Sequence, residues 1–238
     1  MNKTYAFSDI HGIYDLWAQI RDFCDETDTI YFLGDACDRG EDGIAIIDEL
    51  LKDKRVIYLK GNHEDMLTIC VPEFIEGHFE NLPWWVDNGG TSTWASLSNF
   101  SEDAQLYYVR KLNNLPKTAW YASPKGHKVF LSHAGTDLNY TEQELIQMGR
   151  GCKDPYIWDR KHFYSKYPND MQNVYQVHGH TPVLSKDFPI PVWADEKVNK
   201  VVRYNSGHKF NIDMATYVMK EIALIDLDTF NAIYFKER

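Results

Sequence analysis

The sequence has little positive charge and no long hydrophobic run. Its 25 lysine and arginine residues are outnumbered by 35 aspartate and glutamate residues, which gives a formal net charge of −10 and an isoelectric point near 5.3. A chain this acidic lacks the basic surface with which proteins hold the phosphates of nucleic acids or anionic membranes. It contains no apolar stretch of about eighteen residues, and its first residues are too polar for a signal peptide. We therefore expect a soluble cytoplasmic protein with no nucleic-acid and no membrane partner.

Cysteine is scarce, and the sequence shows no repeat, low-complexity stretch or linker. The cysteines are widely separated and form no C-x-x-C pair: Cys24, Cys37, Cys70 and Cys152. This distribution favours reduced thiols over a disulfide framework. Apolar residues make up 44% of the chain and charged residues 25%, as in ordinary globular proteins. We therefore expect one domain that spans residues 1–238.

Strand-like and helix-like segments alternate over about the first sixty residues. Apolar runs at 3–8, 29–33 and 56–59 are separated by segments whose apolar residues recur at helical spacing. This rhythm predicts a βαβαβ unit with neighbouring parallel strands, and therefore an α/β fold. Further strands are expected at 129–132 and 174–177. Several short strands in about the last fifty residues suggest an antiparallel or mixed second sheet.

Five clusters of polar residues and glycine follow these apolar runs. They are Asp9-Ile10-His11-Gly12, 34–40, Gly61-Asn62-His63-Glu64, His133-Ala134-Gly135 and Gly179-His180-Thr181-Pro182. Open α/β sheets bind ligands beyond the carboxyl ends of their strands, so we expect the clusters to converge in space. Their carboxylate, imidazole and amide groups suit Mn²⁺, Fe²⁺ or Zn²⁺ better than Ca²⁺. Two such ions about 3.5–4 Å apart, sharing a bridging carboxylate, are an arrangement used for phosphoester hydrolysis.

The same motifs resemble those of a known enzyme family. In order, D-x-H-G, G-D-x-x-D-R-G, G-N-H-E, H-A-G and G-H-T-P are similar to the phosphoprotein phosphatase branch of the calcineurin-like metallophosphoesterases. Within that branch the sequence is most similar to the short bacterial and lambda-type enzymes. The resemblance extends from Asp9 to about Asp213. It implies an α/β fold in which a β-sandwich of two mixed sheets is flanked by helices, in α/β/β/α layers.

The resemblance implies a centre of two divalent metal ions, for which we expect manganese, with iron or zinc as alternatives. The implied ligands are Asp9 and His11 for the first ion, Asp35 as a bridge between both, and Asn62, His133 and His180 for the second. Bound ions of this kind lower the pKa of a shared water, and the resulting hydroxide attacks phosphorus in line.

The resemblance also implies a general acid and two phosphate clamps. His63 would protonate the leaving alcohol, and the carboxylate of Asp38 would orient it. Arg39 would hold the phosphate oxygens, and Asn62 would also contact the substrate. Trp158-Asp159-Arg160 is similar to the W-x-R element of the family, which makes Arg160 the second clamp.

Some positions leave alternatives open. Arg150 competes with Arg160 for the role of second clamp, and His178 fits packing beside the site better than a ligand role. Residues 149–172 show no clear hydrophobic periodicity. We expect them to form a surface loop, an excursion from the fold that covers the active site. Residues 211–215 depart from the usual D-T-G of the family, which puts the loop geometry there in question.

The leading hypothesis is a dinuclear-metal-dependent phosphomonoesterase that acts as a serine/threonine protein phosphatase. Its substrate would be a phosphorylated protein or a small phosphoester. The alternative is a symmetrical diadenosine tetraphosphate hydrolase; such enzymes resemble the chain but typically lack the acid at Asp38 and carry aspartate in place of Glu64. A catalytically dead module that binds phosphorylated partners is less favoured, because no ligand of the motif set is missing.

Overall fold

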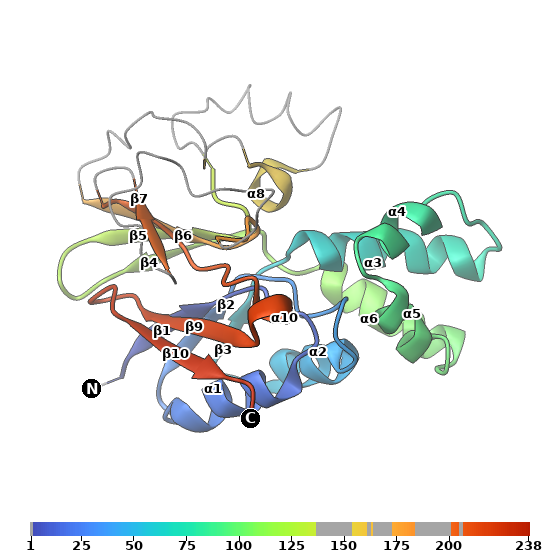
Figure 1. The fold of residues 1–238 in the computed structure, drawn as a ribbon, viewed down its shortest axis with the longest axis horizontal. Helices are drawn as coiled ribbons and strands as arrows, with labels where there is room; N and C mark the ends of the chain where they lie inside the picture. Colours follow the sequence, from blue (N-terminus) through green and yellow to red (C-terminus); the bar gives the residue numbers. More distant parts are fainter. Residues whose placement is uncertain (1, 137–153, 161–162, 164–172, 184–200, 205–206) are drawn as a thin grey trace.

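The computed structural model describes residues 2–136, 154–160, 163, 173–183, 201–204 and 207–238. The strands of these residues form two five-stranded sheets that lie one above the other (Figure 1). Helices lie below the first sheet and form a separate lobe at one side. Two mixed sheets flanked by helices confirm the predicted α/β fold class.

The first sheet has the strand order β10-β9-β1-β2-β3. Its strands are β1 (Thr4–Phe7), β2 (Thr29–Phe32), β3 (Val56–Tyr58), β9 (Glu221–Asp226) and β10 (Ala232–Lys236). Strands β1, β2 and β3 run parallel, as the βαβαβ rhythm predicts. Strand β9 pairs antiparallel with β1, and β10 pairs with β9. The last two strands therefore extend the first sheet, so the expectation that the strands of about the last fifty residues build a second sheet is wrong for β9 and β10.

The second sheet has the strand order β4-β5-β6-β8-β7. Its strands are β4 (Thr118–Ala122), β5 (Lys128–Ser132), β6 (Val174–His178), β7 (Val202–Tyr204) and β8 (Lys209–Asn211). Strands β5, β6 and β8 run parallel, while β4 and β7 form antiparallel edges. The parallel strands send the chain after β5 and after β6 to the same edge of the sheet, where the predicted histidines follow.

Two helices cover the first sheet, and four more form the lobe at its side (Figure 1). They are α1 (Tyr14–Phe23) and α2 (Gly43–Lys52), and α3 (Asn62–Ile75), α4 (Leu82–Asp87), α5 (Thr91–Leu97) and α6 (Glu102–Asn113). Two short helices, α8 (Pro155–Trp158) and α10 (Thr216–Met219), lie near the strand ends. In the described part of the chain, no helix is long and apolar enough to cross a membrane.

Alternation along the strands divides the core between two faces of the first sheet. Phe7 and Phe32 face the helices and pack with Trp17 of α1. Ala6 and Leu33 belong to the core shared with the second sheet. Because both faces of the sheet are buried, the positions and register of β1 and β2 are fixed. The loops that follow these two strands are therefore held at one edge of the first sheet.

Candidate metal centre

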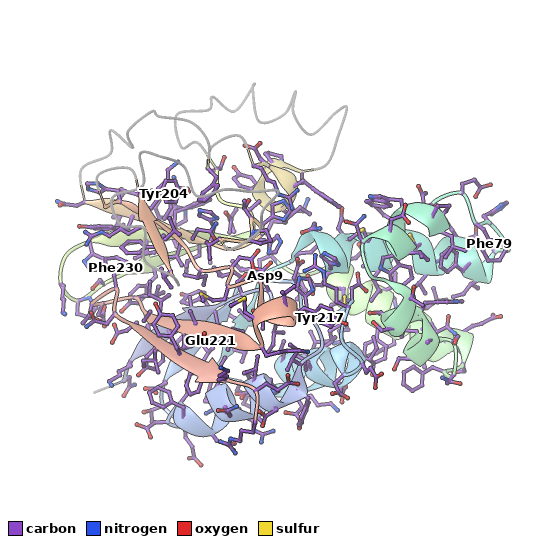
Figure 2. The ribbon with its side chains drawn as sticks, in the orientation of Figure 1. Asp9, Phe79, Tyr204, Tyr217, Glu221 and Phe230 are labelled. Carbon is purple, nitrogen blue, oxygen red and sulfur yellow. The ribbon has the colours of Figure 1, made fainter. Side chains whose placement is uncertain are left out.

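The predicted metal ligands come from the ends of strands in both sheets. Asp9 and His11 follow β1, Asp35 follows β2, and Asn62 begins α3 just after β3; His133 and His180 follow β5 and β6 of the second sheet. All six side chains are buried, and Asp9 lies between the two sheets in Figure 2. The structure therefore brings together residues that are up to 171 positions apart, as from Asp9 to His180.

Several of these residues adopt a backbone conformation that is costly for a side chain. The φ angle is positive at Asp9 (55°), His11 (47°), Asp35 (65°) and His180 (67°). Left-handed conformations of non-glycine residues cost free energy and gather at functional sites. The strand ends thus turn sharply at the candidate ligands themselves, which directs four side chains into one space.

Glycines provide the room for this convergence. A Cβ atom at Gly179 would collide with the carboxylate of Asp9, and one at Gly61 would collide with that of Asp35. The G-N-H-E and G-H-T-P motifs therefore need their glycines because a predicted ligand from another strand passes directly beside the backbone.

Each predicted histidine ligand has one ring nitrogen bonded to a backbone carbonyl. Nδ1 of His11 donates to the carbonyl oxygen of Cys37 (3.0 Å), and Nδ1 of His133 donates to that of Leu33 (2.8 Å). Nε2 of His180 lies 3.3 Å from the carbonyl oxygen of Trp158. These bonds fix the orientation of each ring. The nitrogens that remain as candidate metal ligands are Nε2 of His11, Nε2 of His133 and Nδ1 of His180.

The remaining nitrogens of His133 and His180 face other acceptors, whereas that of His11 faces the guanidinium group of Arg39. Oδ1 of Asn62 lies 2.9 Å from Nε2 of His133 and 2.8 Å from Nδ1 of His180, and the two nitrogens are 3.2 Å apart. Oδ2 of Asp35 lies 3.3 Å from Nε2 of His133. Imidazole, amide and carboxylate groups that converge in this way fit a metal ion of the borderline class.

Asp35 takes part in two groups of candidate ligands. Among the described residues, the donor atoms of His11, Asp35 and His63 lie within 4.8 Å of one another, and so do those of Asp9, Asp35 and His133. A carboxylate common to both groups fits the predicted bridge, and His63, the expected general acid, stands in the first group where Asp9 was the expected ligand. The expected pairing of Asp9 with His11 is not one of these groups. The Asp9 carboxylate instead accepts hydrogen bonds from the backbone N–H of His180 (3.1 and 3.3 Å).

Burial and proximity shift the pKa values of these groups in opposite directions. Burial raises the pKa of Asp9 to about 6. Burial would also raise the pKa of Asp35, but the imidazoles of His133 and His63 hold it well below its usual range. Burial opposes the charge on His133, yet the carboxylate of Asp35 outweighs it and raises the pKa of His133 to about 9. A proton on His133 is therefore the cation that balances Asp35 when no metal is bound.

His63 and Asp38 form a buried pair beside this cluster. Nδ1 of His63 donates to Oδ2 of Asp38 at 2.7 Å, and the indole nitrogen of Trp85 donates to the same oxygen at 2.9 Å. The backbone N–H of Asp38 donates to Oγ1 of Thr93 (2.8 Å). Nε2 of His63 lies 3.7 Å from Oδ2 of Asp35 and 3.4 Å from Nη2 of Arg39, so it lies between the candidate metal centre and a predicted phosphate clamp. The helical lobe thus fixes the pair, a connection that the motif spacing does not show.

Glu64 ties the loops that follow β2 and β3 together. Its carboxylate accepts hydrogen bonds from the backbone of Asp35 (2.9 Å), Ala36 (2.7 Å) and Gly61 (2.8 Å). It also accepts one from the hydroxyl of Tyr58 (2.8 Å). Glu64 therefore holds the predicted bridging residue in place through the backbone, without touching the candidate ligand atoms.

A match to the sequence model of a protein family shows which family the chain belongs to. The model of the calcineurin-like phosphoesterases matches residues 3–211. The chain belongs to the calcineurin-like phosphoesterases. Enzymes of this family hydrolyse phosphoesters and depend on two metal ions, and this phosphoesterase has candidate ligands for them. No curated protein sequence matches the chain.

Solved structures share the fold of this phosphoesterase at low sequence identity. A candidate diadenosine tetraphosphatase matches with a TM-score of 0.59 and 16% identity, covering 98% of this chain and 93% of the other. A Saccharomyces cerevisiae protein serine/threonine phosphatase with similarity to human phosphatase PP5 matches with 0.58 and 14%, covering 98% and 79%. A cold-active protein-tyrosine phosphatase from a psychrophilic Shewanella matches with 0.60 and 16%, covering 98% and 77%. These likenesses establish the fold.

The candidate site of the phosphoesterase opens into a cavity of about 240 Å³. The cavity is lined by Asp9, Asp35, Arg39, Asn62, His63, Asn88, Trp158, Arg160, His180, Pro182 and Asp213. Both predicted clamps, Arg39 and Arg160, therefore line the same space as the candidate ligands. Nη1 of Arg39 lies 2.5 Å from Nε2 of His11. Nη2 of Arg160 donates to the carbonyl oxygen of His180 at 3.2 Å.

Two cavity residues with polar side chains, Asp213 and Asn88, were given no role by the motifs. Asp213 follows β8, and burial, together with the nearby charge of Asp9, raises its pKa well above the usual range. The position of Asp213 shortly after a strand is the sequence signal that could have identified it as a site residue. Ala215 takes a positive φ (53°) where the family motif has glycine, and its N–H donates to Asp213 at 2.9 Å. Asn88 reaches the cavity from the helical lobe, which spacing alone does not predict.

Trp158 connects the cavity to the helical lobe. Its indole nitrogen donates to Oδ2 of Asp65 (3.1 Å), and the other oxygen of Asp65 accepts from the ammonium group of Lys60 (2.8 Å). Its ring stacks on Trp84 with the centroids 5.6 Å apart. Because the Trp158 carbonyl faces His180, these contacts set the position of a predicted ligand and of the nearby clamp.

The remaining alternatives have different outcomes. His178 lies 2.6 Å from the hydroxyl of Tyr204 and 3.0 Å from the carbonyl oxygen of Gly179, which agrees with a packing role. Arg150 lies outside the described residues. So does most of the predicted excursion at 149–172, of which the structure describes 154–160 and 163.

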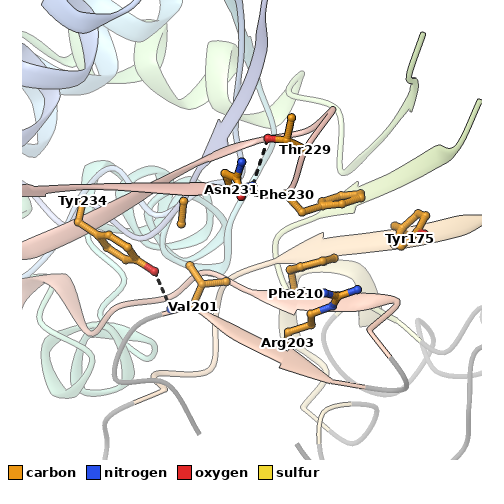
Figure 3. A pocket seen from close by; sticks show the side chains of 9 residues that line it. Tyr175, Val201, Arg203, Phe210, Thr229, Phe230, Asn231 and Tyr234 are labelled. Atoms are coloured by element: carbon orange, nitrogen blue, oxygen red, sulfur yellow. Dashed lines mark hydrogen bonds between the residues drawn. The ribbon is translucent and has the colours of Figure 1, made fainter. Parts of the chain in front are cut away.

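A larger cavity, of about 380 Å³, lies elsewhere in the molecule (Figure 3). Its lining includes the stacked rings of Phe210 and Phe230, with centroids 4.5 Å apart, and the side chain of Arg203. None of the predicted metal-binding or catalytic residues is among its described lining residues. The candidate active site is therefore the smaller cavity.

Proposed function

We propose that the chain is a metal-dependent phosphomonoesterase that removes phosphate from phosphoserine and phosphothreonine in proteins. The observation that carries this proposal is the buried His63–Asp38 pair, with its 2.7 Å hydrogen bond, beside two groups of candidate ligands that share Asp35. A histidine held by a carboxylate is suited to donate a proton to a leaving group.

The need for such an acid depends on the substrate. The alkoxide of serine or threonine is a poor leaving group and must be protonated as it departs. The phenoxide of tyrosine and the phosphate oxygen of a nucleotide are better leaving groups and need less assistance. A site that places an oriented acid beside its candidate metal centre therefore favours an aliphatic phosphomonoester over diadenosine tetraphosphate.

The other residues would bind and position the phosphate. Arg39 and Arg160 carry permanent charge and can donate two parallel hydrogen bonds to phosphate oxygens. Asn62 offers its amide beside the same cavity. Two divalent ions, for which manganese is our first candidate, would be held by Asp9, His11, Asp35, Asn62, His133 and His180. When bound, such ions supply charge neutralisation and an activated water.

A comparison of substrates tests the proposal. With Mn²⁺ present, we expect faster turnover of a phosphoserine peptide than of a phosphotyrosine peptide or diadenosine tetraphosphate at equal concentration. Faster turnover of the dinucleotide would replace the proposal by a diadenosine tetraphosphate hydrolase. If the protein binds no metal and hydrolyses none of the three, a phospho-partner-binding module is the better account.

A further inference from the structure

A second cavity adjoins the one at the candidate metal centre. It has a volume of about 400 Å³, and the side chain of Arg39 lines both. On its other sides lie the turn before α2, with Glu41 and Asp42, and the segment of Tyr217 and Lys220. We call this hollow the Arg39 groove. Because the two cavities meet at a predicted phosphate clamp, a substrate larger than its phosphate can extend from one into the other.

The Arg39 groove carries an excess of negative charge. Lys220 lies 3.6 Å from Glu237, which balances its charge, and Asp15 accepts the N–H of Arg238 at 2.9 Å. Glu41 and Asp42 are exposed, and no ion pair of their carboxylates occurs in the described part of the chain. Among the described residues, four carboxylates and two cations (Arg39 and Lys220) line the groove, and the carboxylates of Glu41 and Asp42 are the two exposed ones without an ion pair.

An apolar surface borders the groove on α10, where Figure 2 labels Tyr217. Tyr217, Val218 and Met219 are 41%, 77% and 42% exposed. Ala215 and Lys220, which flank this four-residue helix, both have a positive φ (53° and 54°). Three consecutive apolar side chains thus lie at the surface between two left-handed residues, and exposed apolar patches commonly mark contact sites.

We propose that the Arg39 groove receives the polypeptide segment next to a phosphorylated residue, and favours segments with lysine or arginine beside an apolar side chain. The inference rests on the proposed phosphatase function and extends it to the substrate sequence. Glu41 and Asp42 attract a cationic segment, whereas they repel the several negative charges of a dinucleotide polyphosphate. The side chains of α10 cover the apolar residue of the same segment.

Two phosphoserine peptides of equal length test this selectivity. One carries arginine and leucine beside the phosphoserine, and in the other the arginines are replaced by alanine. Exposed ion pairs contribute about 0.2–1 kcal/mol each, so two of them predict a preference of about two- to thirtyfold in kcat/KM for the basic peptide. The double variant E41K/D42K should lose this preference.

A matched control reverses two other acids. The variant E102K/D103K changes the same number of charges in the first turn of α6, another helix start. It should keep the preference of the wild-type protein. The ratio between peptides cancels any general effect of added charge on phosphate binding. An equal preference in wild type and E41K/D42K overturns the inference.

Direct binding separates this inference from the proposed function. The probe is the basic peptide without phosphate, labelled with fluorescein and followed by anisotropy at low salt. We expect wild type and E102K/D103K to bind it more tightly than E41K/D42K does. If this difference appears while neither phosphopeptide is hydrolysed, the groove stands and the phosphatase function fails. If both peptides are hydrolysed but the three proteins bind the probe equally, the groove proposal fails and the function stands.

Discussion

The proposed general acid can be tested by varying the leaving group. His63 donates through Nδ1 to Asp38, and both side chains are buried, with 2% and 0% of their surface exposed. Replacing His63 by asparagine removes the proton donor but keeps a polar side chain that can still bond to Asp38. The variant should therefore bind metal as the wild type does and fail only in protonating the leaving oxygen.

The expected loss follows from this role. General acids typically contribute 10²–10⁴ in rate, which corresponds to about 3–5 kcal/mol of transition-state stabilisation. Asp38→Asn keeps an acceptor for Trp85 but removes the charge that stabilises protonated His63. A hydrogen bond to a charged group is worth about 1.5–3 kcal/mol, so we expect a loss of about ten- to a hundredfold.

The assay compares kcat on a phosphoserine peptide with kcat on p-nitrophenyl phosphate. The nitrophenolate leaves without protonation, so His63→Asn should slow the peptide reaction strongly and the nitrophenyl reaction little. Metal content, measured on the same samples, shows that the site is intact. Equal losses on both substrates with full metal content would refute the acid role of His63.

Three further predictions concern protons and positioning. Because His133 has a pKa of about 9, Mn²⁺ binding at pH 7 should release about one proton, seen by calorimetry in buffers of different ionisation enthalpy; identical heats would contradict this. Burial lowers the pKa of His178 to about 3, so unfolding takes up a proton between pH 3 and 6.5. Stability should fall there by about 1.4 kcal/mol per pH unit on acidification, and His178→Phe should lessen that slope in denaturation with EDTA. Asp65→Ala and Trp158→Phe should each raise KM for p-nitrophenyl phosphate about three- to tenfold, with little change in kcat, and the double variant should be no worse than either; additive effects would exclude a shared role.

Local patterns in the sequence predicted the part of the fold that holds the candidate ligands. The apolar runs that became β1, β2 and β3 are followed by polar residues and glycine, so both the parallel strands and their convergence could be predicted. The sheet membership of β9 could not, because it depends on pairing with β1 from the other end of the chain. Strand β4 was missed because its residues are only half-buried or exposed and show no clear alternation.

The candidate site also combines features that the local sequence predicts with features that depend on contacts between distant segments. Motif glycines and strand ends indicated the buried ligands, since each signal lies within a few residues of the side chain. The contacts of Trp85 with Asp38 and of Asp65 with Trp158 join segments 47 and 93 residues apart. Such contacts are set by how the helical lobe packs, which no local spacing encodes.

The central claim is that Asp35 bridges two metal ions, and metal stoichiometry tests it most directly. The protein would be loaded with Mn²⁺, freed of excess by gel filtration and analysed for manganese per chain. We predict two ions per chain in the wild type and the loss of both in Asp35→Asn, since one carboxylate serves both groups of ligands. Two ions retained in Asp35→Asn, or none in the wild type, would contradict the account.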